Sequence, residues 1–252
     1  MIWFKIWKDS RKHMLAGFGI VMLAALVQGV IAPSGLTIFG LDPTRFPHLP
    51  LVSSALPDPR APGFARSAWW LLYLNVAVLI APMMGIITAG SGISSQTADG
   101  MRRSHPSVMY TLSLPVARRR WMAARAAFGF LQMAILILLL AIVPAALAPV
   151  TGGHFSWVLA LRAFPFMIAG ATVFYALAMF LATFLDEYWQ ALASVVALMG
   201  LAVVVSAGQF PEVNIFRFMS GFGPSSIGTV ACLAITALFF AGAIWVVERQ
   251  EF

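Results

Sequence analysis

The sequence predicts an all-α polytopic membrane protein, a single domain over residues 1–252 with six transmembrane helices. Of its 252 residues, 61% are hydrophobic and only 10% are charged, whereas a soluble domain carries about 25% charged residues. The charges are clustered, which leaves six windows of 23 to 36 residues without Asp, Glu, Lys or Arg. About 20 apolar residues suffice to cross a hydrocarbon core about 30 Å thick. This composition excludes soluble enzymes, nucleic-acid-binding proteins and secreted disulfide-bonded domains.

The six windows set the approximate bounds of the predicted helices. The apolar run of the first window, about 20 residues, exceeds the 7–15 residues of a cleavable signal peptide, so we expect it to stay as a membrane helix. Pro82, Pro144 and Pro165 fall inside predicted helices, where neighbouring helices can satisfy the freed backbone groups. The expected helices are 14–36, 68–92, 124–148, 157–185, 189–207 and 225–247.

Two predicted external connections differ in character. Residues 37–67 contain six prolines, which block long regular structure and predict an external loop. Residues 208–224 are rich in phenylalanine and too apolar for a solvated loop. This second segment either dips into the outer interface or forms a short re-entrant helix packed on protein.

The distribution of positive charge predicts the orientation. With six crossings, both termini lie on one side, and that side collects 11 of the 16 Lys and Arg residues. An excess of Lys and Arg marks the cytoplasmic side. We therefore expect cytoplasmic termini and an integral protein of the bacterial cytoplasmic (inner) membrane.

The first 13 residues predict an amphipathic interfacial helix. Their tryptophans share one helical face and their lysines the opposite one, which suits a helix that lies along the inner leaflet. A generic basic anchor before the first span is the alternative interpretation. The predicted anchor residues are Trp3, Trp7, Lys5, Lys8 and Lys12.

The predicted spans lack the groups that membrane chemistry needs. No histidine lies at depth, so Ser91, which stands between two glycines, has no base to activate it. No cluster with metal-ligand spacing occurs, and Cys232 is the single cysteine. Ion-coupled transport needs ionisable groups within the spans. We therefore expect no catalytic residue, no metal site and no coupled proton or sodium ion.

The cytoplasmic loop over residues 93–123 carries the strongest functional signal. Pro106 suits a first helical turn and Pro115 ends the run, which predicts a helix of two to three turns between them. Val108, Met109 and Leu112 give this helix an apolar surface outside the bilayer. Such a surface, flanked by arginines, is typical of a docking site for a partner protein. The alternative is an interfacial helix that rests on lipid.

This loop resembles a motif of the type-2 ABC exporter permease family. Asp99-Gly100, followed by the run 112–118 (Leu-Ser-Leu-Pro-Val-Ala-Arg), is similar to the family's pattern of an acid and glycine and then Leu-x-Ser-Leu-Pro-Val-Ser-Arg. In that family the segment follows the second of six helices and includes the coupling helix that enters a cleft on the ATPase. The resemblance implies that the docking residues are Asp99, Gly100, Pro106, Val108, Met109, Leu112, Leu114, Pro115 and Arg118.

The resemblance implies the membrane subunit of an ATP-driven exporter. The chain contains no Gly-x-x-x-x-Gly-Lys-Ser/Thr pattern, so it does not bind ATP through a P-loop and is not an enzyme by itself. ATP and magnesium then belong to two copies of a separate ABC ATPase, and the path forms with a second permease, identical or paralogous. The uncharged spans favour an apolar or amphipathic substrate such as a lipid, peptide or drug. A non-transport scaffold or receptor whose loop docks a regulator, and a passive channel, are the alternatives.

Overall fold

The computed structural model describes residues 2–31, 64–89, 94–96, 102–104, 118–147, 157–206, 215–220 and 226–249. This part of the chain is almost entirely helical, which confirms the predicted helical class. Its one departure is a pair of three-residue strands. The elements are α1 (Ile2–Ile31), α2 (Phe64–Thr88), β1 (Ser94–Gln96), β2 (Arg102–Ser104), α4 (Arg118–Leu147), α5 (Trp157–Leu181), α6 (Glu187–Ser206), α7 (Ile215–Met219) and α8 (Ser226–Arg249).

Three helices in the described part of the chain are long and apolar enough to cross a membrane. They comprise Arg120–Leu147 of α4, Ala160–Leu181 of α5 and Ile227–Arg249 of α8. Val76–Thr88 of α2 and Tyr188–Ala202 of α6 are shorter apolar helices. The chain is thus built as a helical membrane protein, while the count of six spans and the cytoplasmic side of the termini stay predictions.

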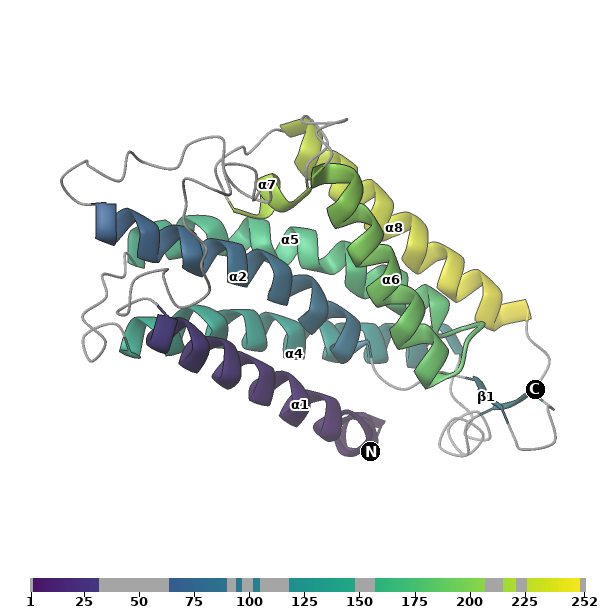
Figure 1. Cartoon of the computed structure of the whole chain (residues 1–252). Coiled ribbons are helices and arrows are strands. Elements are labelled where there is room, and N and C mark those ends of the chain that lie inside the picture. The colour runs from purple at the N-terminus through teal and green to yellow at the C-terminus, as the bar shows by residue number, and fades with distance from the viewer. Residues whose placement is uncertain are drawn as a thin grey trace.

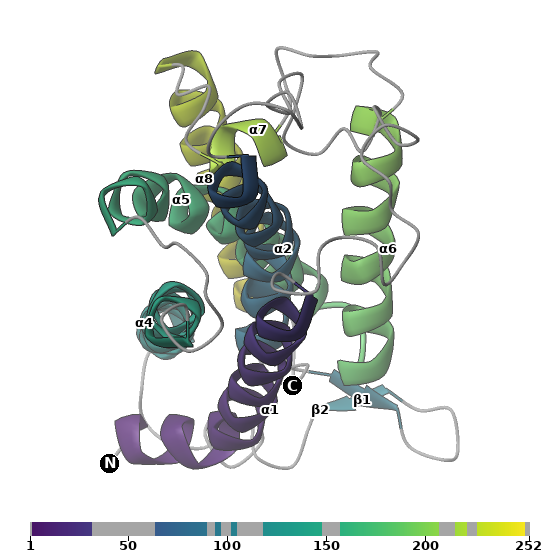
Figure 2. The ribbon, with the colours of Figure 1, turned by 60° about the vertical axis from the view of Figure 1, so that its left-hand side comes forward.

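The helices form a bundle around α5 (Figure 1). α5 packs against α2, α4, α6, α7 and α8, whereas α1 packs against α2 and α4. Figure 2 shows α6 at one side of this bundle, opposite α4. The first turn or two of α1 run at an angle to the rest of that helix in the same view.

Several functionally interesting segments share one end of the bundle. In both views the start of α1, the β1–β2 ribbon and the turn between α5 and α6 lie at the same end (Figures 1 and 2). β1 pairs with β2 in antiparallel register, with Ser95 opposite Arg103. We call this end the ribbon end. In the predicted topology, this end of the bundle faces the cytoplasm.

Small residues let the helices of the core approach closely. Ala171, Tyr175 and Ala178 of α5 are fully buried. A Cβ atom at Gly85 of α2 would lie 2.7 Å from the carbonyl oxygen of Ala171, so the close crossing of α2 and α5 requires glycine there. The two helices can therefore pack backbone to backbone.

The observed bounds differ most from the predicted ones at the starts of α1 and α4. α1 is one continuous helix from Ile2, so the predicted interfacial helix and first span are parts of the same element. α4 begins at Arg118 rather than near residue 124. The sequence predicts that Arg118, Arg119 and Arg120 belong to the 93–123 loop, but they form the first turn of α4. Arginine has a favourable helix propensity, so the helix can begin before the apolar residues do.

The short helix α7 lies inside the phenylalanine-rich connection 208–224. Phe216, Phe218 and Met219 are buried. The rings of Phe218 and Phe166 of α5 meet edge to face, with centroids 5.3 Å apart. The apolar side chains of this helix are thus covered by protein.

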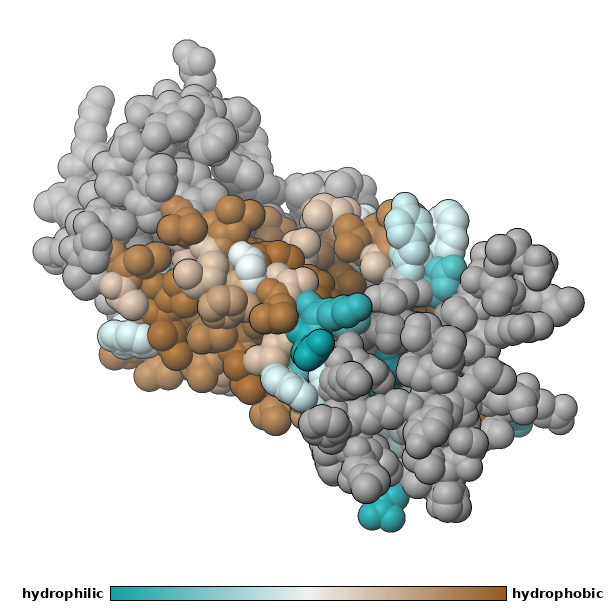
Figure 3. All heavy atoms as spheres, turned by 90° about the horizontal axis from the view of Figure 1, so that it is seen from below, coloured by the Kyte–Doolittle hydropathy of each residue, from teal (hydrophilic) through white to brown (hydrophobic). Residues whose placement is uncertain are grey.

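Large apolar side chains also cover the outside of the molecule. Figure 3 shows hydrophobic residues spread over the face to which α1 and α4 contribute. Side chains on α8 are similarly exposed, among them Ile227 and Leu238, which are 80% and 70% exposed. Apolar surface of this extent suits contact with lipid chains. Exposed members include Leu15, Phe18, Leu23, Leu26, Leu131, Ile135, Leu138 and Ile142.

Candidate functional site

The candidate site is described from the end of α2 and the start of α4. These two helices are connected by the segment 90–117, which contains most of the predicted docking residues. The carbonyl oxygen of Ala89 follows the last turn of α2 and accepts a hydrogen bond from Arg125 Nη2 of α4 at 3.3 Å. The last carbonyls of a helix lack intrahelical partners and carry partial negative charge, so a guanidinium suits this position. Arg125 also lies over the ring of Trp121, 5.6 Å from its centroid.

Tyr175 joins α5 to the same junction. Its side chain is fully buried, and its hydroxyl donates a hydrogen bond to the carbonyl oxygen of Ala126 at 2.9 Å. Gly129 of α4 leaves the room for this ring, since a Cβ there would come within 3.0 Å of Tyr175 Cε2 and 2.8 Å of the Thr88 carbonyl oxygen. α2, α4 and α5 are therefore fastened together near the end of α2 and the first turns of α4. We call these contacts the α2–α4–α5 junction.

Most of the predicted docking residues lie outside the described residues. This holds for Asp99, Gly100 and the run from Pro106 to Pro115, which includes Val108, Met109, Leu112 and Leu114. Arg118 is the first residue of α4. The structure thus describes the elements that precede, interrupt and follow the predicted docking segment in the sequence: α2, the β1–β2 ribbon and α4.

The predicted interfacial anchor is described in part. Trp3, Lys5 and Lys8 belong to α1, and their side chains lie outside the description. Trp7 is half exposed and meets Phe128 of α4 edge to face, with ring centroids 6.0 Å apart. Lys12 is exposed. The start of α1 therefore packs on α4 through Trp7, while Lys12 is exposed.

A second contact between α1 and α4 is polar. Gln132 Nε2 donates a hydrogen bond to Ser10 Oγ at 2.9 Å. Its Oε1 atom is buried and has no hydrogen-bond partner. This contact is the kind of interhelical hydrogen bond by which polar side chains hold membrane helices together.

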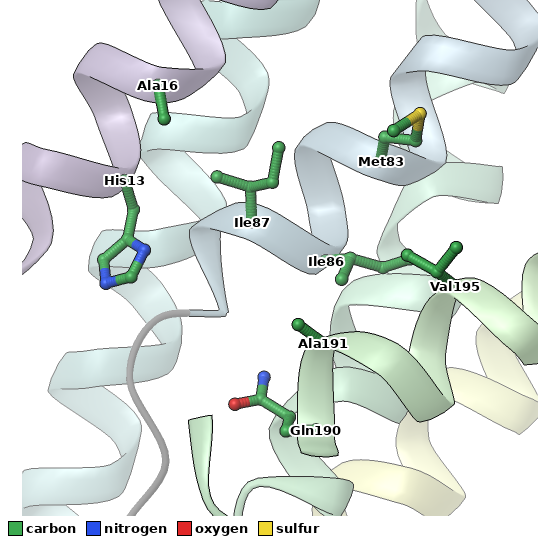
Figure 4. Close-up of a pocket in the computed structure, with 8 residues that line it drawn as sticks. All are labelled: His13, Ala16, Met83, Ile86, Ile87, Gln190, Ala191 and Val195. Atoms are coloured by element: carbon green, nitrogen blue, oxygen red, sulfur yellow. The ribbon is translucent and has the colours of Figure 1, made fainter. Parts of the chain in front are cut away.

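A pocket opens between α1, α2 and α6 near the ribbon end (Figure 4). Its volume is about 260 Å³, and most of its lining is apolar. Gln190, in the first turn of α6, contributes a buried amide, which Figure 4 shows directed toward the space between α6 and α1. The lining residues are His13, Ala16, Met83, Ile86, Ile87, Gln190, Ala191 and Val195.

A capped helix start positions Gln190. Asp186 Oδ1 accepts a hydrogen bond from the Trp189 backbone N–H at 3.0 Å, the geometry of an N-cap. The short turn that joins α5 to α6 ends at this aspartate, so α6 begins close to the end of α5. The position of the Gln190 side chain is therefore set by the turn rather than by a long loop.

Sequence reasoning missed three residues of these sites. Tyr175, Gly129 and Gln190 each stand in a helix that is apolar on every face, so no periodic pattern separated a packed face from a lipid face. The available signal was polarity, since a glutamine two residues after a charged turn is unusual in an apolar helix.

Within the described residues, no group of three or more His, Cys, Asp or Glu residues could hold a metal ion. Comparison of the chain with protein-family models, with curated proteins and with solved structures finds no match.

Proposed function

We propose that this chain is the membrane-spanning permease subunit of an ATP-driven ABC transporter. In this proposal two separate ATPase subunits supply the energy, a second permease completes the path, and an apolar or amphipathic substrate is exported. The proposal rests on the motif between Asp99 and Arg118. The α2–α4–α5 junction supports it, because it joins the two helices that carry this motif.

The junction suggests how a push on the docking segment would travel. Arg125 ties the end of α2 to α4, and Tyr175 ties α4 to α5, so these helices would move as one unit. Packed helices respond by rigid-body movement because a close-packed core does not deform continuously. Closure of an ATPase dimer against residues 106–114 would therefore tilt the bundle rather than bend a single helix.

Copurification and ATP turnover test the proposal. A P-loop ATPase should bind the chain in detergent, and Leu112→Asp should lower the ATP turnover of the complex by about tenfold or more, because a charge in an apolar interface is costly. Deletion of residues 106–114 should abolish it. Tyr188→Asp is the matched control, since Tyr188 is 71% exposed in the other turn at the ribbon end.

Two results would contradict the proposal. In the first, the Leu112→Asp complex keeps both its partner and full ATP turnover. In the second, the partner that copurifies has no nucleotide-binding motif, which would favour the scaffold or receptor interpretation.

A further inference from the structure

α8 has an exposed face that runs the whole length of the helix. The helix lies at one side of the bundle and ends at the ribbon end (Figure 1). Its buried residues, among them Cys232, Ala243 and Val247, lie on the opposite face. Positions three, four and seven apart share a helical face. By this spacing the exposed residues form one continuous stripe, which we call the α8 stripe: Ile227, Val230, Ala231, Ala234, Leu238, Ala241, Trp245 and Arg249.

The α8 stripe changes in character toward the ribbon end. It is apolar as far as Ala241, Trp245 follows with 55% of its surface exposed, and Arg249 ends the helix. Ile227 and Trp245 stand 18 positions apart, which is about 27 Å along a helix. The hydrocarbon core of a bilayer is about 30 Å thick. The apolar part of the stripe therefore matches the hydrocarbon core in length, and the tryptophan and the arginine fall at its boundary.

This order of side chains matches the layers of a lipid leaflet. Apolar side chains suit the acyl chains, tryptophan rings gather at the level of the headgroups, and basic side chains reach the phosphates. A partner protein has no such layers, so the order favours phospholipid as the occupant of the α8 stripe.

Trp245 positions the cation at the end of the stripe. The guanidinium carbon of Arg249 lies 4.1 Å from the centroid of the Trp245 ring, in a cation–π contact between residues four apart. A guanidinium also pairs with phosphate through two parallel N–H groups. The partial negative charge at the C-terminal end of α8 favours a cation at the same place. Arg249 is thus held where a headgroup phosphate would lie.

The charge of the preferred lipid follows from these residues. In the predicted topology the ribbon end faces the cytoplasm, and anionic lipids give that leaflet a negative surface potential. Glu248 is also exposed and would repel an anionic headgroup. Attraction of such a headgroup at this end of α8 therefore depends on Arg249.

We propose that the α8 stripe binds an anionic phospholipid. One acyl chain lies along Leu238 and Ala241, and Arg249, held over Trp245, binds the headgroup phosphate. The lipid lies on the outside of the bundle and requires neither an ATPase nor transport. This inference therefore goes beyond the proposed function and is tested separately from it.

Photolabelling of the full chain tests the proposal without an ATPase. The chain is placed in phosphatidylcholine nanodiscs that contain a trace of phosphatidylglycerol with a diazirine near the start of one acyl chain. A parallel sample contains phosphatidylcholine with the same diazirine, and the labelled peptides are identified by mass spectrometry. Label is expected on residues 238–249. The phosphatidylglycerol probe should label them about fivefold more than the phosphatidylcholine probe, the effect of one basic residue at the membrane surface.

Two variants and one matched control assign this preference to the α8 stripe. Arg249→Gln should make the two probes label residues 238–249 about equally. Trp245→Leu keeps an apolar side chain but removes the ring that holds the cation, and should lower the preference about twofold. Arg120→Gln is the control, because it removes an exposed arginine from the first turn of α4 and should leave the preference at α8 unchanged.

Four results would overturn the proposal. An unchanged preference in Arg249→Gln would show that Arg249 does not bind the headgroup. Equal losses in Arg249→Gln and Arg120→Gln would reduce the effect to the general charge of the chain. Absence of label from residues 238–249 would mean that another protein chain covers the stripe. Competition by inorganic phosphate would indicate a soluble anion rather than a lipid.

Discussion

The two faces of α2 present opposite kinds of packing. Toward α4 and α5, Gly85 and Thr88 are buried in close contacts that leave no room for an added methyl group at Gly85. Toward α1 and α6, Met83 and Ile87 line an open pocket. Residues three and four apart share a helical face, so one helix carries both arrangements. α2 is thus closely packed on one side, while its other side borders a pocket.

The difference fits a division of roles along the same helix. A junction that is to transmit a push must be stiff, and packed, hydrogen-bonded contacts make it so. The pocket, in contrast, leaves space between α1, α2 and α6. Both regions lie near the ribbon end.

Overpacking the junction should have the largest effect. Gly129→Leu places side-chain atoms against the Thr88 carbonyl oxygen and the Tyr175 ring, and should lower the free energy of unfolding by about 3 kcal/mol. Thermal unfolding in detergent measures this. Gly200→Leu on α6 is the control, because a Cβ there meets no atom within 4 Å, and its effect should stay below about 0.5 kcal/mol. Equal effects at the two glycines would mean that the α2–α4–α5 junction is no more closely packed than the surface of α6 around Gly200.

Removal of the unpaired amide should act in the opposite direction. Gln190→Leu replaces a buried acceptor without a partner by an apolar side chain, and should raise the free energy of unfolding by about 1.5 kcal/mol in ligand-free detergent. Gln132→Leu is the matched control. It also removes an unpaired Oε1 but loses the hydrogen bond to Ser10, so its gain should be smaller. A loss of stability in Gln190→Leu would mean that the amide already has a structural role.

The smallest of the three effects concerns a single hydroxyl at the junction. Tyr175→Phe keeps the ring and removes the donor to the Ala126 carbonyl, which should lower the free energy of unfolding by about 1 kcal/mol. Tyr188→Phe, at an exposed position, should have no measurable effect. If the two phenylalanine variants unfold alike, the hydrogen bond does not contribute to fastening α4 to α5.

Much of the fold could be predicted because apolar runs between charges leave few alternatives. Pro82, Pro144 and Pro165 stand within helices, as expected for a chain whose neighbouring helices satisfy the freed backbone groups. The start of α4 at Arg118 was missed because the clustered arginines resemble a solvated loop. The β1–β2 ribbon was missed because strands of three residues carry no readable period.

The candidate sites were harder to predict than the fold. The proposed docking motif can be recognised because its residues lie within one short segment, 99–118. The pocket joins His13, Met83 and Gln190, which are brought together only by the packing of α1, α2 and α6. No local pattern connects residues that are this far apart.

Residue types and their spacing were enough to predict the helical class, the apolar character of the helices and the position of the proposed docking motif between the second and third predicted spans. These follow from residue type and spacing, which act locally. The tertiary structure alone decided which face of α2 packs against α5, which face lines the pocket, and that Gln190 Oε1 has no partner. In a helix that is apolar all round, burial against protein and exposure to lipid favour the same side chains. Only the positions of the neighbouring helices distinguish the two.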